Sequence, residues 1–151
     1  MQRLDAFQES PDIMQSLLAI EKKLSGSGMD RNLVELVRLR SSQLNGCTYC
    51  VDMHAREASQ HGEMMQRINL VSVWRESSLF SDLERAVLAW TESLTRNPGQ
   101  QGTDDAFDEL ATHLSPGEIV NLTLIIGMIN LWNRLGVACR WQHPVDRAEM
   151  A

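Results

Sequence analysis

The sequence predicts an all-α fold, and two observations lead to that prediction. No segment shows the alternation of apolar and polar residues, closed by hairpin turns, that is typical of β-strands. Residues that start or stop helices recur along the whole chain. The length of 151 residues, without an internal repeat, a linker or a low-complexity segment, indicates a single domain over residues 1–151.

The start and stop signals delimit about six to seven helices. The signals are an Asp or Ser before the helix, proline at its first position and glycine after its last turn. Ser81-Asp82-Leu83-Glu84 and Ser115-Pro116-Gly117-Glu118 have the form of a capping box. Asn45-Gly46 and Asn97-Pro98-Gly99 stop the helices that precede them. The expected helices span roughly residues 10–26, 30–44, 47–62, 63–74, 81–96, 103–114 and 115–137.

The last of these helices is apolar on nearly every side. Its apolar run from Ile119 to Trp132 is interrupted only by Asn121, Thr123, Gly127 and Asn130. A helix of this kind must be buried all round, and a domain of this size can hardly cover it alone. We therefore expect a subunit interface on this helix; the alternative is a central core helix in a monomer. The run itself is expected to be too short to span a bilayer.

The composition excludes several classes of function. The 14 basic and 20 acidic side chains give a net charge of −6, and no basic cluster offsets it, which argues against a nucleic-acid partner. Three cysteines, two of them in one CxxC unit, are typical of a functional dithiol in a reducing compartment. The first residues lack the apolar core of a signal peptide. We therefore expect a cytoplasmic protein with no membrane partner.

The segment Cys47-Thr48-Tyr49-Cys50, followed by His54, carries the chemistry. On a helix, these two cysteines and the histidine fall within an arc of roughly 60°. If the helix starts at residue 46 or 47, both thiols lie in its first turn, where unpaired N–H groups favour a thiolate. A dithiol beside a base such as His54 is what thiol–disulfide or peroxide chemistry requires.

The cysteines allow two other interpretations. Buried cysteines can act simply as small apolar side chains. A zinc site needs four ligands, but His61 is too far along the helix to complete one with Cys47, and the pattern does not place Cys139. No metal is therefore expected. His61, His113 and His143 have no comparable partner and are expected to be surface or packing residues.

Glu35 is a carboxylate in an otherwise apolar segment, residues 33–39. An ion pair with Arg38 or Arg31 on the same helix is one explanation, and the sequence alone favours it. In the other explanation the carboxylate is half-buried beside the dithiol, has a raised pKa, and exchanges protons with the thiols.

The order Glu35, Cys47-Thr48-Tyr49-Cys50, His54 resembles the motif of the alkylhydroperoxidase D-like branch of the carboxymuconolactone decarboxylase family. The similarity covers roughly residues 4–142 and includes three further segments, residues 36–46, 88–92 and 129–135. The resemblance implies an all-helical fold that assembles into trimers or hexamers. It also implies a thiol-dependent peroxidase activity that needs neither a metal nor a bound cofactor.

The resemblance further implies a role for each site residue. Cys50 resembles the peroxidatic cysteine, which becomes a sulfenic acid, and Cys47 resembles its proton donor and resolving partner. Glu35 and His54 resemble the proton relay. The implied partners are a hydroperoxide substrate and an external dithiol or protein reductant. The residues alone would instead favour the first cysteine as the attacking one, as in thioredoxin-type sites.

Tyr49 departs from the family pattern, which carries a histidine immediately before the second cysteine. A phenol titrates at about pH 10 and cannot replace imidazole as a base, although it can donate a hydrogen bond. We therefore expect a different reductant and a weaker peroxidase. Two rival functions stay open: a redox-sensing dithiol without turnover, and lactone decarboxylation as in the same family, which does not depend on the CxxC pair.

Overall fold

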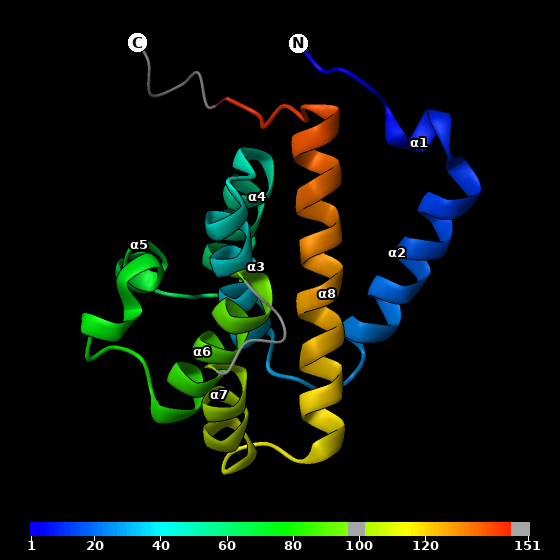
Figure 1. The fold of residues 1–151 in the computed structure, drawn as a ribbon. Helices are drawn as coiled ribbons and strands as arrows, with labels where there is room; N and C mark the ends of the chain where they lie inside the picture. Colours follow the sequence, from blue (N-terminus) through cyan, green and yellow to red (C-terminus); the bar gives the residue numbers. More distant parts are fainter. Residues whose placement is uncertain (97–101, 146–151) are drawn as a thin grey trace, which may run out of the picture.

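The computed structural model describes residues 1–96 and 102–145, and this part of the chain is all-helical, as predicted (Figure 1). Its elements are α1 (Ala6–Glu9), α2 (Pro11–Ser25), α3 (Arg31–Asn45), α4 (Thr48–Gln60), α5 (Met65–Leu70), the 3-10 helix η1 (Val71–Glu76), α6 (Asp82–Arg96), α7 (Gly102–Ala111) and α8 (Pro116–Cys139). The predicted stop at Asn97-Pro98-Gly99 lies outside the described residues.

Side-chain caps place several helix ends where the sequence predicted them. Asp30 accepts a hydrogen bond from the Leu33 amide at 2.9 Å at the start of α3. Ser115 and Glu118 form a capping box at the start of α8. Gly46 ends α3 with a φ of 67°, a left-handed conformation that favours glycine. This turn lets α4 fold back along α3 (Figure 1).

The helix predicted over residues 63–74 is divided into α5 and η1, so this prediction was wrong in part. The backbone leaves the helical region at Val73, where φ is −124°. A 3-10 turn aligns residues three apart, and here it buries Val71 and Trp74 together. Tertiary packing of this pair outweighs the continuation of an α-helix. The short helix α1, which Asp5 caps, was also not predicted.

The central helix α3 contributes to two apolar clusters on different sides. Its Val34 and Val37 pack with side chains of α6 and α8, among them Val87, Trp90, Leu122 and Ile126. Its Leu36 and Leu39 pack with Val71, Trp74 and Leu88 in the other cluster. Burial of each such side chain contributes about 1.5–3 kcal/mol. The polar residues of α3 are therefore held on a rigid element.

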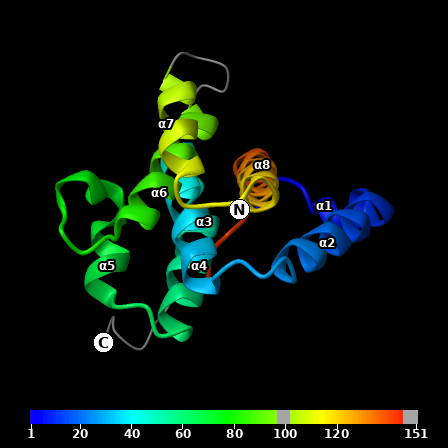
Figure 2. The same ribbon diagram turned by 90° about the horizontal axis from the view of Figure 1, so that it is seen from below.

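The helices α1 and α2 form an arm on the opposite side of α8 from the rest of the bundle (Figure 2). The arm packs against α8, and its buried side chains include Met14 and Leu24. The start of α4, the end of α8 and α1 meet at one end of the molecule (Figure 1). A site at that end can therefore draw on segments from distant parts of the chain.

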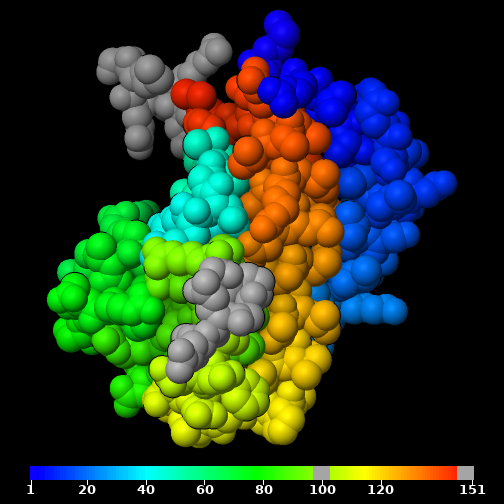
Figure 3. Space-filling model, in the orientation of Figure 1, coloured from blue at the N-terminus to red at the C-terminus, as the bar shows by residue number. Residues whose placement is uncertain are grey.

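The helix α8 is long and apolar but only partly covered. By length and composition alone this helix could cross a membrane, contrary to the expectation that its apolar run is too short. An 18-residue stretch of the helix has a mean hydropathy of 1.4, and 39% of that stretch is buried. It packs against α2, α3, α4, α6 and α7, which is the arrangement of a core helix. Val120 and Leu124 are nevertheless 58% and 51% exposed, and α8 is open along its length in Figure 3. A groove of about 840 Å³ follows it, lined in part by Leu94, Ile126 and Leu131.

We predict that this exposed face of α8 packs against a second copy of the chain. Leu124→Glu should shift the protein toward monomers, because an unpaired carboxylate is costly to bury in an apolar interface. Light scattering at micromolar concentration measures the change. Ile13→Glu, at an exposed position on α2, is the matched control and should leave association unchanged. A wild-type protein that is monomeric under these conditions would contradict the prediction.

Candidate functional site

The two cysteines lie at the start of α4, as predicted. Cys47 is the N-cap residue, and its Sγ accepts a hydrogen bond from the Cys50 amide at 3.4 Å. The structure joins Cys47 and Cys50 in a disulfide, and both residues are buried. The positive end of the helix favours negative charge here, so it stabilises a thiolate once the disulfide is reduced.

The backbone of α8 passes very close to the disulfide at Gly136. A Cβ atom at this position would lie 2.8 Å from Sγ of Cys47 and 3.4 Å from Sγ of Cys50. It would also lie 3.3 Å from the ring of Trp141. Only glycine allows so close an approach of backbone and sulfur. Gly136 therefore fixes where α8 lies relative to the cysteines.

His54 lies one helical turn beyond Cys50 and is held by two carboxylates. Its Nδ1 is 2.8 Å from Oε2 of Glu35 and 3.2 Å from Oε2 of Glu57. Glu35 is on α3 and is buried with His54, whereas Glu57 is on α4 and is half-exposed. The structure thus brings together all four residues that the sequence predicted for the site, Glu35, Cys47, Cys50 and His54.

The two explanations considered for Glu35 turn out to be compatible. Its Oε1 accepts a hydrogen bond from Arg38 at 3.1 Å, while its Oε2 faces His54. The ion pair within the helix and the contact with the histidine therefore use different oxygens of one carboxylate. Arg31, the other candidate partner, lies 3.5 Å from Nε2 of His61.

The carboxylates favour the protonated form of His54. Burial alone would lower the pKa of His54, but the hydrogen bonds to Glu35 and Glu57 outweigh burial and raise it above the ordinary value of 6.5. The hydrogen bond to His54 in turn lowers the pKa of Glu57. The imidazole can therefore hold a positive charge beside the cysteine pair.

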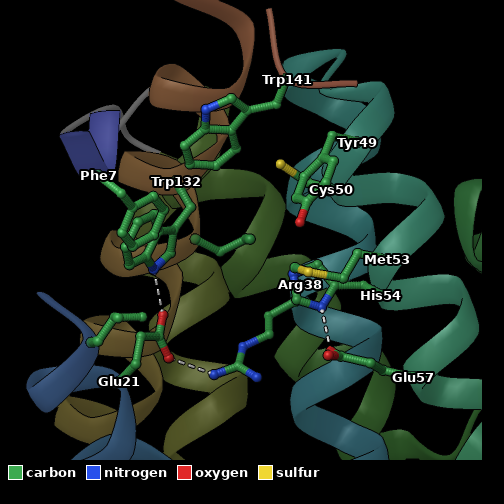
Figure 4. A pocket seen from close by; sticks show the side chains of 12 residues that line it. Phe7, Glu21, Arg38, Tyr49, Cys50, Met53, His54, Glu57, Trp132 and Trp141 are labelled. Carbon is green, nitrogen blue, oxygen red and sulfur yellow. Dashed lines mark hydrogen bonds and ion pairs between the residues drawn. The ribbon is translucent and has the colours of Figure 1, made fainter. Parts of the chain in front are cut away.

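The other ring nitrogen of His54 is buried and has no hydrogen-bond partner among the described residues. An unpaired buried polar atom of this kind is rare and costly in a folded protein. With Nδ1 donating to Glu35, the lone pair of Nε2 is free to accept a proton. Cys50 and His54 line the same pocket (Figure 4), so Nε2 can take a proton from a thiol there.

This pocket, which we call the first pocket, has a volume of about 290 Å³. Its lining combines apolar and aromatic side chains with charged ones: Phe7, Leu18, Glu21, Arg38, Tyr49, Cys50, Met53, His54, Glu57, Ile129, Trp132 and Trp141 (Figure 4). These residues come from α1, α2, α3, α4 and α8 and from the segment after α8. The pocket is therefore a product of the tertiary fold.

Trp141 connects the aromatic rings of the first pocket. Its ring centroid lies 5.5 Å from Tyr49, 6.4 Å from Trp132 and 6.5 Å from Phe7. Trp141 was not predicted as a site residue, because a tryptophan after the end of a helix carries no local signal of its position in the fold. Glu57 was missed as well, although its spacing of three residues from His54 places both on one helix face.

A chain of hydrogen bonds ties the arm to the site (Figure 4). Glu21 of α2 accepts a hydrogen bond from Nε1 of Trp132 at 2.8 Å and another from Arg38 at 2.7 Å. Arg38 also donates to Glu35. Glu21 therefore links the wall of the first pocket to the carboxylate that holds His54.

The described residues with metal-ligand geometry are Glu35, His54 and Glu57, whose ligand atoms lie within 4.8 Å of one another. The two cysteines do not belong to this group and are joined to each other in a disulfide. Because His54 Nδ1 already bonds both carboxylates, an ion would have to replace these hydrogen bonds.

A model of the carboxymuconolactone decarboxylase family matches residues 11–93. The chain belongs to this family. YdfG of Bacillus subtilis strain 168, an uncharacterized protein, is 35% identical over 137 residues, which are 91% of this chain and 93% of YdfG. YnjA of Escherichia coli K12, also uncharacterized, is 33% identical over 113 residues, 74% of this chain and 61% of YnjA.

Solved structures share the fold. A protein of Agrobacterium tumefaciens of unknown function, a candidate antioxidant defence protein AhpD, has a TM-score of 0.93 at 42% identity, over 97% of this chain and all of that one. The predicted alkylhydroperoxidase D-like fold is therefore confirmed. The debrominase Bmp8 has a TM-score of 0.82 at 21% identity, over 92% of this chain and 75% of Bmp8, and this likeness concerns the fold alone.

We predict that Gly136→Ala destabilises the disulfide form. The added Cβ would lie 2.8 Å from Sγ of Cys47, and overpacking of this kind costs about 1–3 kcal/mol. Gly127→Ala on the same helix is the matched control; its Cβ meets nothing within 4 Å, and helix propensity predicts a gain of about 1 kcal/mol. Chemical denaturation measures both free energies of unfolding. Equal effects of the two substitutions would contradict the close approach at Gly136.

The raised pKa of His54 predicts that stability depends on pH. The folded state binds this proton more tightly than the unfolded state does. The stabilisation that the proton on His54 provides is therefore complete below pH 6.5, and it is lost as the pH rises through the pKa of His54 in the folded state. One group changes the free energy of unfolding by at most about 1.4 kcal/mol per pH unit.

The measurement is the free energy of unfolding of the disulfide form against pH, for wild type and for His54→Gln, which cannot titrate. The advantage of wild type over the variant should shrink above pH 6.5. If the curves for wild type and His54→Gln stay parallel through this range, His54 binds its proton no more tightly in the folded state than in the unfolded state.

Proposed function

We propose that the protein is a thiol-dependent peroxidase of the alkylhydroperoxidase D type, which reduces an apolar hydroperoxide at Cys50. The supporting observation is the state of His54. It is buried, held through Nδ1 by Glu35 and Glu57, and keeps Nε2 unbonded beside the pocket that Cys50 lines. A histidine prepared in this way accepts the thiol proton and stabilises the thiolate that results.

The first step consumes the peroxide. The Cys50 thiolate attacks the terminal oxygen of R–O–OH, an S–O bond forms, and the O–O bond breaks. The electron pair leaves on the RO⁻ oxygen, which takes a proton from the imidazolium of His54 and departs as the alcohol. Cys50 is now a sulfenic acid, oxidised by two electrons.

The second step protects the sulfenic acid from further oxidation. The Cys47 sulfur attacks Sγ of Cys50, the two sulfurs bond, and the hydroxyl group leaves as water with the proton of Cys47. The Cys47–Cys50 disulfide, which is present in the structure, supports this step because it is the product that the step would form. An external dithiol, of the kind present in the cytoplasm, then restores both thiols by exchange.

Arg38, Glu35 and Glu57 act on the chemistry through His54. Glu35 and Glu57 bond only Nδ1 and so leave Nε2 as the proton-transfer atom. Arg38 holds Glu35 from the other side and keeps the carboxylate in position. These residues are positioning residues in the proposed reaction, since each of them is proposed to act through His54.

The lining of the first pocket indicates the substrate class. Trp132, Trp141 and Phe7 offer apolar and aromatic surface next to Cys50. The carboxylates of Glu21 and Glu57 also line it and disfavour an anion. We therefore propose a neutral, apolar hydroperoxide as the substrate, with an aromatic one such as cumene hydroperoxide as the probe.

Reductive dehalogenation of an aromatic ring is a second candidate, because the same aromatic lining would suit it. A variant of the debrominase Bmp8, which shares the fold, was solved with 2,3,4-tribromopyrrole. In such a reaction the Cys50 thiolate would take the halogen, the ring would take a proton, and Cys47 would displace halide as the disulfide forms. Release of bromide from a bromopyrrole with excess dithiol, at a higher rate than cumene hydroperoxide is consumed, would favour this function.

We predict that Cys50→Ser abolishes the consumption of cumene hydroperoxide with excess dithiothreitol, because no nucleophile remains at the first pocket. Without dithiothreitol, Cys47→Ser should instead stop after one sulfenate per chain, which a dimedone-type reagent traps. Cys139→Ser is the matched control and should turn over like wild type. Mass spectrometry and peroxide titration measure these outcomes.

Three results would contradict this proposal. Trapping of a sulfenate only in Cys50→Ser would exchange the roles of the two cysteines. Consumption of one equivalent of peroxide by wild type, with no turnover, would indicate the redox-sensing module. Full activity on a lactone in Cys50→Ser would indicate the decarboxylase.

A further inference from the structure

We infer that the disulfide is reduced from the side opposite to the peroxide, by a slender dithiol that enters a second pocket and attacks Cys47. This inference rests on the proposed function and adds a binding site for the reductant. It assigns separate entrances to the two half-reactions.

The second pocket has a volume of about 300 Å³ and lies where α4 begins and α8 ends. The residues of its lining that matter here are Gly46, Cys47, Thr48, Gly136, Val137 and Arg140. Cys47 lines this pocket and Cys50 lines the first one, and neither cysteine is among the described residues that line the other pocket. The two cysteines of one disulfide therefore line different pockets.

Tyr49 and Trp141 line both pockets and separate them. Their rings meet edge to face, with centroids 5.5 Å apart and planes at 73°. On the other side of the disulfide the backbone of α8 is in contact at Gly136. A molecule in the second pocket can therefore reach Cys47 without passing through the first pocket.

The geometry of thiol–disulfide exchange favours this direction of attack. The incoming thiolate must approach one sulfur in line with the bond to the other. From the second pocket it meets Sγ of Cys47, a new S–S bond forms, and the Cys47–Cys50 bond breaks. The electron pair leaves on Cys50 as a thiolate. The second thiol of the reductant then displaces Cys47, which takes up a proton, and the reductant departs as a cyclic disulfide.

The charges around the two pockets support the same direction. A reducing thiolate is an anion. Arg140 is the charged side chain among the described residues of the second pocket, whereas in the first pocket the carboxylates of Glu21 and Glu57 lie beside Arg38 and His54. The leaving thiolate, Cys50, is also the one beside His54, and a stabilised leaving group speeds the exchange. Attack on Cys47 thus returns Cys50 directly to the state that reacts with peroxide.

The burial of Cys47 limits the class of reductant. The residue is only 2% exposed, so a thiol on a flat protein surface cannot touch its sulfur. A small dithiol, or a thiol carried on a thin flexible arm, can enter the second pocket. Dithiothreitol is therefore a suitable probe.

The experiment fills each pocket separately and measures each half-reaction separately. Val137 of α8 lines the second pocket and is 51% exposed, and Leu18 of α2 lines the first pocket and is 48% exposed. Val137→Trp and Leu18→Trp are therefore matched substitutions at exposed helical positions. The reduction of the disulfide by dithiothreitol and the oxidation of the reduced protein by cumene hydroperoxide are followed by stopped-flow sampling and mass spectrometry.

Val137→Trp should slow reduction of the disulfide by at least about tenfold, because the added ring keeps the dithiol from the correct position at Cys47. The same substitution should leave oxidation by the peroxide unchanged. Leu18→Trp should slow oxidation and leave reduction unchanged. The inference is overturned if Val137→Trp is reduced at the wild-type rate, or if Leu18→Trp slows reduction as strongly as oxidation. Failure of the proposed function would look different, because wild type would then not be oxidised by the peroxide although its disulfide is still reduced.

Discussion

The buried contact between Glu35 and His54 is the interaction on which the arrangement of the site depends. It joins α3 to α4, two helices that pack along each other and are linked by the short turn at Gly46. Both side chains are almost fully buried, and removal of one partner from such a pair costs about 3–5 kcal/mol because a buried charge is left alone. The contact therefore holds the imidazole in one orientation one turn beyond Cys50.

The cost of burying these charges is offset by a network that extends to both sides. Arg38 lies between Glu35 and Glu21, and Glu57 adds a second acceptor at His54. When His54 is protonated, this network has one net negative charge, because it contains three carboxylates, one guanidinium and one imidazolium. When His54 is neutral it has two, which explains why the network favours the proton. The same excess of negative charge disfavours an anionic molecule in the first pocket.

The second constraint is the close approach of α8 to the disulfide. Gly136 brings the backbone of α8 against both sulfurs, and Trp141, five residues later, contacts the rings of Tyr49, Trp132 and Phe7. One helix end therefore shapes the aromatic wall of the first pocket and the partition from the second. Farther toward its start, α8 exposes Val120 and Leu124. The groove lined by residues of α6 and α8 is separate from the two pockets at the cysteines.

The sequence by itself determined the helical class and most of the helix ends, and it predicted that Cys47, Cys50 and His54 lie on one face of a helix. These features depend on local signals: Asp30 and Ser115 cap helices, Gly46 takes a left-handed turn, and Cys47, Cys50 and His54 share a helix face. The division of residues 63–74 could not be predicted in the same way, because the joint burial of Val71 and Trp74 decided it.

Only the tertiary structure decided which cysteine faces which pocket. Local reasoning from thioredoxin-type sites favoured Cys47 as the attacking residue, yet Cys50 is the one that lines the aromatic pocket. The partners of Glu35 were also decided by the tertiary structure. Arg38 lies on the same helix as Glu35, but His54 comes from another helix. Phe7, Glu21, Trp132 and Trp141 lie far from the CxxC segment along the chain, and they reach it only because α2 and α3 pack on different sides of α8. Packing between distant segments leaves no periodic or capping signal in the sequence, and for that reason the pocket could not be read from it.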